Sequence, residues 1–157
     1  MNDYYITNLS RFTLREYLEL LKQLSPETYL DSDTNDAVAF NNFNMEGYKS
    51  TFIVLSKPCR KIIGAASVVF EPKFNRKSTL KNTTAICGHI EDVIIDKDYR
   101  NRGIGKYLIN YVLDVCKSKG CYKVILDCAS ENVEFYKKCG FEETNFTPHE
   151  ICMRINL

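Results

Sequence analysis

The chain has 157 residues, of which 45% are hydrophobic, and its 21 basic and 20 acidic residues leave a formal net charge of +1. This size and composition predict one globular domain over residues 1–157 with a sizeable core. The balanced charge provides no overall field for nucleic acid or a membrane surface, and no stretch approaches about 18 continuous apolar residues. The first residues lack the basic-then-apolar order of a signal peptide, so a cytoplasmic location is expected.

The first half of the chain alternates strand and helix patterns. Residues 4–9 predict a strand, and Ser10 or Thr13 is a candidate N-cap of a helix that Pro26 ends. The expected apolar face of this helix is Leu14, Tyr17, Leu18, Leu21 and Leu24. A second helix is predicted near residues 35–44, with Val38, Phe40 and Phe43 partly buried, and two neighbouring strands are predicted at 51–55 and 61–70.

In the second half, the polar residues 75–82 predict an exposed connection and residues 89–95 a central strand. The main helix is expected at 103–119, with Ile104, Leu108, Tyr111, Val112, Val115 and Cys116 turned inward. A strand at 124–128, a short helix at 132–139 and strands near 141–144 and 151–155 complete the order. The pattern predicts an α+β fold, with a mixed, mostly antiparallel sheet flanked by helices.

The seven cysteines do not form a metal or disulfide pattern. No two of them are spaced as C-x-x-C, and only His89 and His149 are available to assist a metal site. Their number is odd, and most sit in apolar segments, where cysteine behaves as a small hydrophobic residue. Buried, reduced thiols and no metal are expected. A catalytic cysteine is the minor alternative, since none has a histidine at a suggestive place.

A glycine-bearing turn follows the apolar run 93–95 and opens the main helix. Its pattern is Arg-x-x-Gly-x-Gly, from Arg100 to Gly105. Glycine lets the backbone approach a ligand closely, and the first turn of a helix presents unpaired N–H groups and partial positive charge. The turn therefore predicts a pyrophosphate site. The alternative is a plain connector between a strand and a helix.

Three further segments follow the same order as in a known family. They are GHIEDV at 88–93, GCYKVILDC at 120–128 and NVEFYKKCGF at 132–141. Together with the glycine turn they resemble the GNAT acetyltransferase superfamily and, within it, the glucosamine 6-phosphate N-acetyltransferase family. The resemblance is strong over 88–141, and it is traceable over 14–73 and at Arg154. It implies a GNAT fold and acetyl-CoA-dependent N-acetylation of D-glucosamine 6-phosphate, a step in UDP-N-acetylglucosamine synthesis.

The resemblance also implies where the coenzyme binds. The backbone of Val93, Ile94 and Ile95 is expected to pair with the pantetheine arm, as an added strand pairs with a sheet edge. A bulge in this strand is expected to free a backbone N–H at Val93 for the thioester oxygen. The remaining coenzyme contacts are expected from Asn101, Arg102, Gly103, Ile104, Gly105, Lys106, Asn132, Tyr136, Lys137 and Lys138.

Four side chains are expected to serve the reacting groups. Tyr136 is the candidate general acid for the departing thiolate; its alternative is an ordinary core ring. Glu91, Asp92 and Asp127 are the carboxylates expected beside the acceptor amine. The alternatives are a turn cap for Asp127 and a surface ion pair for Glu91.

The same resemblance implies the sugar-phosphate contacts: Ser25, Lys73, Arg76, Tyr122, Lys123 and Arg154. Arg76 stands where the family often carries a histidine, next to a connection a few residues longer than the family's usual one. The family forms dimers whose C-terminal strands cross, so a homodimer is expected in which Arg154 serves the partner's site.

Two other functions remain open from the residues. One is GNAT chemistry on another small amine or a protein amine, although a polyamine site should lack the basic positions Lys73, Lys123 and Arg154. The other is a non-catalytic acyl-CoA-binding or scaffold protein, which would need the glycine turn but not Tyr136, Asp127 and Glu91. An assay of thiol release from acetyl-CoA with a panel of amines discriminates between them, because a binder releases no thiol with any amine.

Overall fold

The structure is a computed structural model that describes residues 3–28, 33–43, 47–74 and 84–143. Its contacts divide the chain after Asp127 into two compact units. The first unit holds the sheet and three helices, and the second begins at Cys128. The expectation of one domain over 1–157 therefore stays a prediction, and each unit is described by itself.

The first unit is built on a five-stranded sheet in the order β1-β2-β3-β4-β5. Four antiparallel strands follow one another: β1 Tyr4–Asn8, β2 Lys49–Ser56, β3 Ile62–Phe74 and β4 Thr84–Ile95. The last strand, β5 Cys121–Leu126, runs parallel to β4 because helix α3 crosses over between them. The predicted mostly antiparallel mixed sheet is confirmed, but β3 rather than residues 89–95 occupies its centre, and β4 starts earlier, at Thr84.

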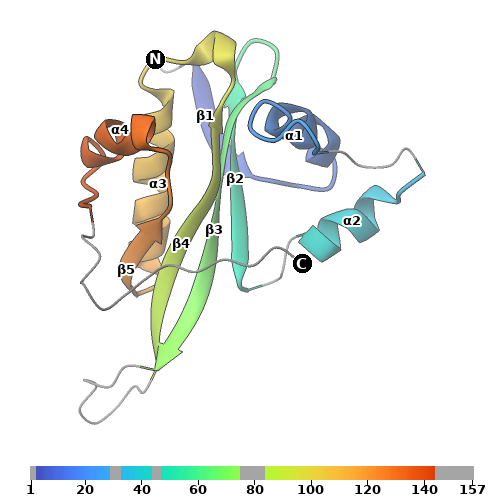
Figure 1. Cartoon of the computed structure of the whole chain (residues 1–157). Helices are drawn as coiled ribbons and strands as arrows, with labels where there is room; N and C mark the ends of the chain where they lie inside the picture. The colour runs from blue at the N-terminus through green and yellow to red at the C-terminus, as the bar shows by residue number, and fades with distance from the viewer. Residues whose placement is uncertain (1–2, 29–32, 44–46, 75–83, 144–157) are drawn as a thin grey trace. The chain divides into compact units, whose positions relative to one another are not determined.

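Helices cover both faces of this sheet (Figure 1). Helix α1, Leu14–Leu21, packs on the face that carries Ile53, Ala65 and Ile94. Helix α2, Asp36–Phe43, adjoins it, with the Phe43 ring 5.7 Å from that of Tyr17. Helix α3, Ile104–Ser118, lies on the opposite face, where the rings of Tyr111 and Phe52 are 5.3 Å apart. Neighbours Phe52 and Ile53 thus serve opposite cores, as strand alternation requires.

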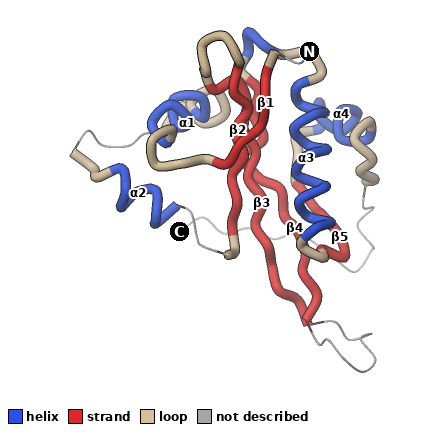
Figure 2. Tube along the Cα trace, turned by 180° about the vertical axis from the view of Figure 1, so that it is seen from behind, coloured by secondary structure: helices blue, strands red, loops and turns tan. Residues whose placement is uncertain are grey.

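The two longest strands extend beyond β2. The pairing of β2 with β3 ends at Lys49 and Val69, whereas β3 and β4 stay paired as far as Phe74 and Thr84 (Figure 2). Five more residues of β3 therefore pair with β4 without a β2 partner, and among the described strands the pairs of Lys73 with Ala85 and of Phe74 with Thr84 lie beyond the end of β5 as well. The predicted exposed connection, residues 75–82, lies outside the described residues.

Three helix side chains differ from the sequence predictions. Helix α1 ends at Leu21, since the N–H groups of Gln23 and Leu24 bond three residues back, to the Leu20 and Leu21 carbonyls. Leu24, in this tighter turn, is 53% exposed. Val38 is 55% exposed on α2, and Tyr111 is 37% exposed on α3. The residues that are buried beyond the predicted faces are Leu20 in α1 and Ile109 in α3.

The second unit contains a 3-10 turn, Ser130–Asn132, followed by helix α4, Val133–Lys137. The helix is shorter than the predicted 132–139. The Tyr136 ring lies edge-on to Phe135, at 5.0 Å, and to Phe141, at 5.9 Å. Residues 141–143 are not in a strand, so the predicted strand near 141–144 is wrong over its described part, and the predicted strand 151–155 lies outside the described residues.

The cysteines only partly match the predicted buried thiols. Cys87, Cys116 and Cys139 are buried. Burial raises the pKa of the Cys116 thiol to about 12, so it stays protonated at neutral pH. Cys59 and Cys128 are exposed, which corrects the prediction for both. Cys152 lies outside the described residues.

Candidate active site

A β-bulge interrupts β4 where the sequence reads Glu-Asp-Val. Ala65 pairs with Ile94 and Ser67 pairs with Glu91, so one residue of β3 faces two residues of β4, Asp92 and Val93. Asp92 adopts a left-handed backbone with φ of 52°, which aspartate tolerates better than most residues. A bulge leaves its extra residue out of the ladder. The bulge expected at Val93 is therefore confirmed, although the sequence itself did not locate it.

The edge of β4 beyond the bulge is open on the β5 side. The parallel pairing of these strands ends at Ile90 and Leu126. Residues 91–95 therefore have no strand partner on that side among the described residues. An extended amide-bearing ligand can pair with such an edge. Val93, Ile94 and Ile95 are where the resemblance implied pantetheine contacts.

The loop between Asp96 and Lys106, called the phosphate loop below, is shaped by two left-handed residues. Asn101 has φ of 61° and Gly103 has φ of 77°, and Gly103 is the N-cap of α3. No heavy atom would lie within 4 Å of a Cβ at Gly103, so the space beside it is open. Asn101, Arg102, Gly103 and Lys106 are exposed, whereas Ile104 is buried and anchors the helix start. The exposed N-terminus of a 15-residue helix is suited to an anion.

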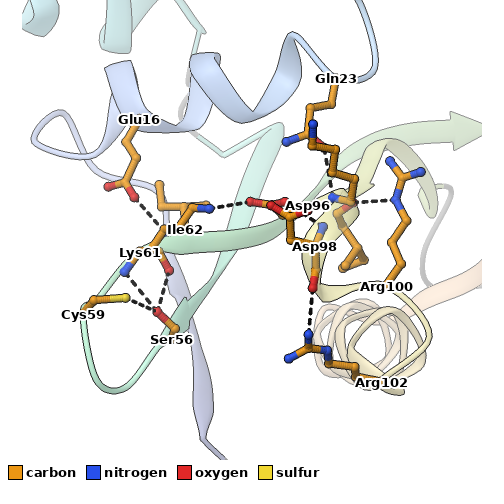
Figure 3. A network of polar contacts seen from close by, with 12 residues as sticks. Glu16, Gln23, Ser56, Cys59, Lys61, Ile62, Asp96, Asp98, Arg100 and Arg102 are labelled. Atoms are coloured by element: carbon orange, nitrogen blue, oxygen red, sulfur yellow. Dashed lines mark hydrogen bonds and ion pairs between the residues drawn. The ribbon is translucent and has the colours of Figure 1, made fainter.

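A polar network anchors this loop to the sheet and to α1 (Figure 3). Asp96 is buried, and its carboxylate lies 2.8 Å from Lys61 Nζ and accepts a hydrogen bond from the Asp98 N–H. Burial acts to raise the pKa of Asp96, but these partners outweigh it and hold the pKa below its usual value. The Lys97 N–H donates to Gln23 Oε1, just beyond α1. The loop base is thus fixed by side chains outside the glycine motif.

The side chains of the two loop arginines are held by hydrogen bonds to backbone carbonyls. Arg100 Nε donates to the Ile95 carbonyl at 3.0 Å, and an Arg102 guanidinium nitrogen donates to the Asp98 carbonyl at 2.8 Å (Figure 3). Both side chains stay exposed, and a guanidinium has five N–H donors, so each retains donors for a phosphate.

Glu91 and Asp92 form a cluster with a lysine that sequence analysis missed. Lys49 Nζ lies 3.6 Å from Asp92 Oδ2 and 3.9 Å from Glu91 Oε2. It also lies 4.3 Å from the centroid of the Phe43 ring. We call Lys49, Glu91 and Asp92 the bulge cluster. No motif pointed to Lys49, because its contacts depend on the β2–β3–β4 register.

A second polar chain follows on the same strand. His89 Nδ1 lies 3.3 Å from Glu71 Oε1, and His89 Nε2 lies 3.7 Å from Asp127 Oδ2. Asp127 follows β5 directly, and its side chain is fully exposed. The histidine thus links the predicted acceptor carboxylate Asp127 to β3. By residue type His89 suggested only a possible metal ligand. Its position two residues before Glu91 places both side chains on one strand face and could have indicated this contact.

The predicted sugar-phosphate residues separate into groups. Lys123 pairs with Cys87 on β4, and its Nζ is 5.6 Å from the Tyr122 ring, with both side chains exposed. Lys73 pairs with Ala85, six residues from Glu91 or about 20 Å along the strand. Its Nζ lies 2.6 Å from Glu71, which raises the pKa of Lys73. Lys73 therefore does not join the bulge cluster.

The remaining predicted substrate contacts are not brought together in the described residues. Ser25 is exposed in the turn after α1, where its N–H donates to the Leu21 carbonyl. Arg76 and Arg154 lie outside the described residues. No helix in the described ranges is long and apolar enough to cross a membrane. Those same ranges contain no cluster of His, Cys, Asp and Glu side chains that could hold a metal ion.

In the second unit, Tyr136 is half-buried. Burial, with smaller contributions from Cys128 and Cys139, raises the pKa of Tyr136 to about 12, so the phenol keeps its proton at neutral pH. Asn132 and Lys138 are exposed. Lys137 Nζ lies 3.0 Å from Glu143 and 3.2 Å from Glu134, and these carboxylates raise its pKa.

Comparison with known proteins gives consistent results. A glucosamine 6-phosphate N-acetyltransferase of Arabidopsis thaliana is 38% identical over 125 residues, covering 79% of each chain. One of Trypanosoma brucei brucei is 41% identical over 107 residues, covering 68% of this chain and 65% of that protein.

Two solved structures of acetyltransferases are similar to this chain over nearly its whole length. A Trypanosoma brucei acetyltransferase matches with a TM-score of 0.81 and 35% identity over 99% of this chain and 100% of the other. The Arabidopsis thaliana glucosamine-6-phosphate N-acetyltransferase matches with a TM-score of 0.76 and 31% identity over 96% and 99%. The fold is the GNAT fold. Since the sequence profile of the acetyltransferase (GNAT) family also matches residues 14–141, the chain belongs to that family.

Proposed function

We propose that this protein transfers the acetyl group of acetyl-CoA to the amine of D-glucosamine 6-phosphate, giving N-acetyl-D-glucosamine 6-phosphate for UDP-N-acetylglucosamine synthesis. The observation that carries the proposal is the bulge at Asp92 and Val93. At this point of β4 the carboxylates of the bulge cluster meet the open strand edge of residues 93–95, which leads into the phosphate loop. The substrate is supported by the names of the Arabidopsis and Trypanosoma relatives.

The chain offers three elements for the coenzyme, which supplies the activated acetyl thioester. The open edge at Val93, Ile94 and Ile95 would hold the pantetheine arm. Asn101–Lys106 would hold the pyrophosphate, with Ile104 and Gly105 contributing backbone N–H groups at the start of α3. The backbone N–H of Val93, outside the regular ladder, would stabilise negative charge on the carbonyl oxygen.

Tyr136 is the proposed acid for the departing thiolate. A phenol with a pKa of about 12 is protonated at every physiological pH, which suits a proton donor. Asn132, Lys137 and Lys138 are proposed coenzyme contacts on the same short segment. The two carboxylates beside Lys137 compete for its ammonium, so we expect its contribution to be smaller than that of Lys138.

The acceptor would be held between the carboxylates and the basic end of β5. Glu91, Asp92 and Asp127 would accept N–H bonds from the amine. Lys123 and Tyr122 are the phosphate contacts that the described sheet supports best, with Lys73, Ser25 and Arg76 as further proposed contacts. Lys73 would first have to exchange its 2.6 Å ion pair with Glu71.

We further propose a cytoplasmic homodimer in which Arg154 of each chain serves the other's site. Its support is the apolar C-terminal sequence Ile151–Ile155, although these residues lie outside the described part. Co-refolding Tyr136→Phe chains with Arg154→Ala chains tests this. Random pairing makes about half the dimers mixed, with one intact site of two, so about a quarter of wild-type activity should return. Activity that stays at the parental level would mean that each chain completes its own site.

A panel of amines tests the reaction. Thiol release from acetyl-CoA is measured with glucosamine 6-phosphate, spermidine, a short peptide with a free amine, and no acceptor. We expect release above the acceptor-free rate with the sugar phosphate alone. Preference for spermidine would assign the acidic residues to a polyamine instead. Binding of acetyl-CoA without thiol release for any amine would identify a non-catalytic binder.

A further inference from the structure

The bulge places two consecutive carboxylates on the same side of the sheet. In a regular strand Glu91 and Asp92 would point to opposite faces. Here both carboxylates lie within 4 Å of one ammonium, Lys49 Nζ, at 3.9 and 3.6 Å. The side chain of Lys49 on β2 lies on one face of the sheet, so it can contact both carboxylates only because the extra residue at Asp92 brings them to that same face. The bulge therefore concentrates two negative charges around a single positive one.

Lys49 is not an ordinary solvated surface lysine. Its side chain is only 14% exposed, and its ammonium lies over the Phe43 ring of α2. Moving an ammonium out of water is costly unless carboxylates compensate for the lost hydration. Fixing this lysine on a ring and between two acids holds the Glu91 and Asp92 side chains in a defined arrangement.

The other groups around the cluster are uncharged or lie against other carboxylates. Tyr17 of α1 is fully buried, and burial, together with the Asp92 charge, raises the pKa of its phenol, so the side chain carries no charge at neutral pH. On β3, Ser67 and Val69 are uncharged. His89, two residues before Glu91 on β4, lies against other carboxylates, 3.3 Å from Glu71 and 3.7 Å from Asp127. Lys49 is the cation that the described residues place against Glu91 and Asp92.

We propose that Lys49 is a positioning residue that limits the negative charge presented to the acceptor amine. The inference rests on the proposed function, in which the amine meets Glu91 and Asp92. An amine attacks only without its extra proton, and an uncompensated carboxylate beside it favours the ammonium form. With Lys49 present, the two carboxylates and one ammonium leave one net negative charge, enough to orient N–H bonds. Without Lys49, the doubled charge holds the acceptor as unreactive ammonium.

The test is the pH dependence of kcat, whose acid limb reports ionisation in the bound complex. Lys49→Met keeps an unbranched apolar side chain at this position and removes the charge, whereas Lys49→Arg keeps the charge. Lys117→Met is the matched control, because it removes an ammonium 3.2 Å from Asp114 on the exposed face of α3. All are assayed with saturating acetyl-CoA and glucosamine 6-phosphate.

We expect the acid limb of Lys49→Met to move up by about one pH unit, so that kcat falls about tenfold near pH 6 and recovers at high pH. Lys49→Arg and Lys117→Met should keep the wild-type limb. A Lys49→Met limb at the wild-type position, with or without lower kcat throughout, would overturn the proposal. If that variant fails to fold, Lys49→Gln carries the same expectation.

Failure of the proposed function is recognised separately. If the wild type acetylates another amine, the same limb is measured with that amine and must still move in Lys49→Met. A wild type that acetylates no amine overturns both the function and this role of Lys49, before any variant is examined.

Discussion

The bulge cluster and the phosphate loop adjoin each other along the chain, yet they are built by opposite means. In the bulge cluster, side chains from β2 and β4 hold one another through ion pairs, with Lys49 only 14% exposed. In the phosphate loop, the positions that face solvent are set by backbone conformation, with left-handed Asn101 and Gly103 and an exposed helix start. The bulge cluster is therefore defined by its charges, and the phosphate loop by its backbone conformation.

This difference separates two kinds of defect. A change of charge in the bulge cluster should alter the binding or the protonation of the acceptor amine and leave the affinity for the coenzyme unchanged. A change of backbone freedom in the loop should weaken coenzyme binding and leave the acceptor amine unaffected. The chain joins the two regions through residues 93–95 and Asp96, whose buried carboxylate anchors the loop base.

The largest effect is expected outside both regions, at Tyr136. Tyr136→Phe keeps the ring against Phe135 and Phe141 and removes the proton donor. We expect kcat to fall about 100-fold or more, with the coenzyme dissociation constant nearly unchanged. Because the pKa of Tyr136 is about 12, its loss should not remove any alkaline limb below about pH 11. An unchanged kcat, with chemistry shown to be rate-limiting, would mean that the thiolate leaves without this phenol.

The next effect concerns the shape of the loop. Gly103→Val should raise the dissociation constant of coenzyme A at least tenfold in calorimetry, because Val resists a φ of 77° and its side chain would enter the open space. Gly120→Val is the matched control: it lies beyond the other end of α3, with φ of 73° and equally open surroundings. Both variants should lose similar stability. Equal coenzyme affinity in the two would remove the phosphate-loop assignment.

An exchange of Asn and Asp sharpens the comparison further. Asp92 and Asn101 both have left-handed backbones, which either residue type tolerates, so Asp92→Asn and Asn101→Asp change mainly charge. Asp92→Asn should raise KM for the acceptor about tenfold and leave coenzyme binding alone. Asn101→Asp should weaken the binding of coenzyme A about tenfold and leave KM for the acceptor unchanged. Steady-state kinetics with each substrate varied would contradict the account if both variants changed the same constant.

The smallest effect is on stability, at the loop anchor. Lys61→Met leaves the buried Asp96 carboxylate without its ammonium, and because Lys61 is half-exposed and screened, we expect a loss of about 1 kcal/mol in urea unfolding at pH 7. The folded pKa of Asp96 is lowered and that of Lys61 is raised. The difference from wild type should therefore persist from about pH 4 to pH 10.5 and shrink outside that window. A difference that grew below pH 4 would contradict the assignment.

Much of the fold could be predicted from the sequence, because local patterns carry it. The helical spacing of Leu14, Tyr17 and Leu21 and the glycine turn before Ile104 predicted two helices that the structure confirms. The sequence also predicted carboxylates in the strand that holds the bulge. Leu24, Val38 and Tyr111 are more exposed than predicted, although the Tyr111 ring does face Phe52 of the sheet, because the exposure of a residue at a helix end or at the edge of an apolar face depends on packing.

The candidate site was predicted less completely, because its geometry is non-local. Lys49 reaches Asp92 only through two strand registers and a bulge, and no spacing in the sequence encodes that contact. The link from His89 to Glu71 and Asp127 likewise needs β3, β4 and the end of β5 together. Separation along a strand, rather than residue type, sets Lys73 apart from the bulge cluster.

The central claim is that the acceptor is a phosphorylated amino sugar. The most direct measurement compares kcat/KM for glucosamine 6-phosphate and glucosamine with saturating acetyl-CoA, and locates the new acetyl group on the amine by mass spectrometry. We predict at least about a 100-fold preference for the phosphorylated sugar, since a charge-assisted phosphate grip contributes only there. Comparable values for the two sugars would contradict the account.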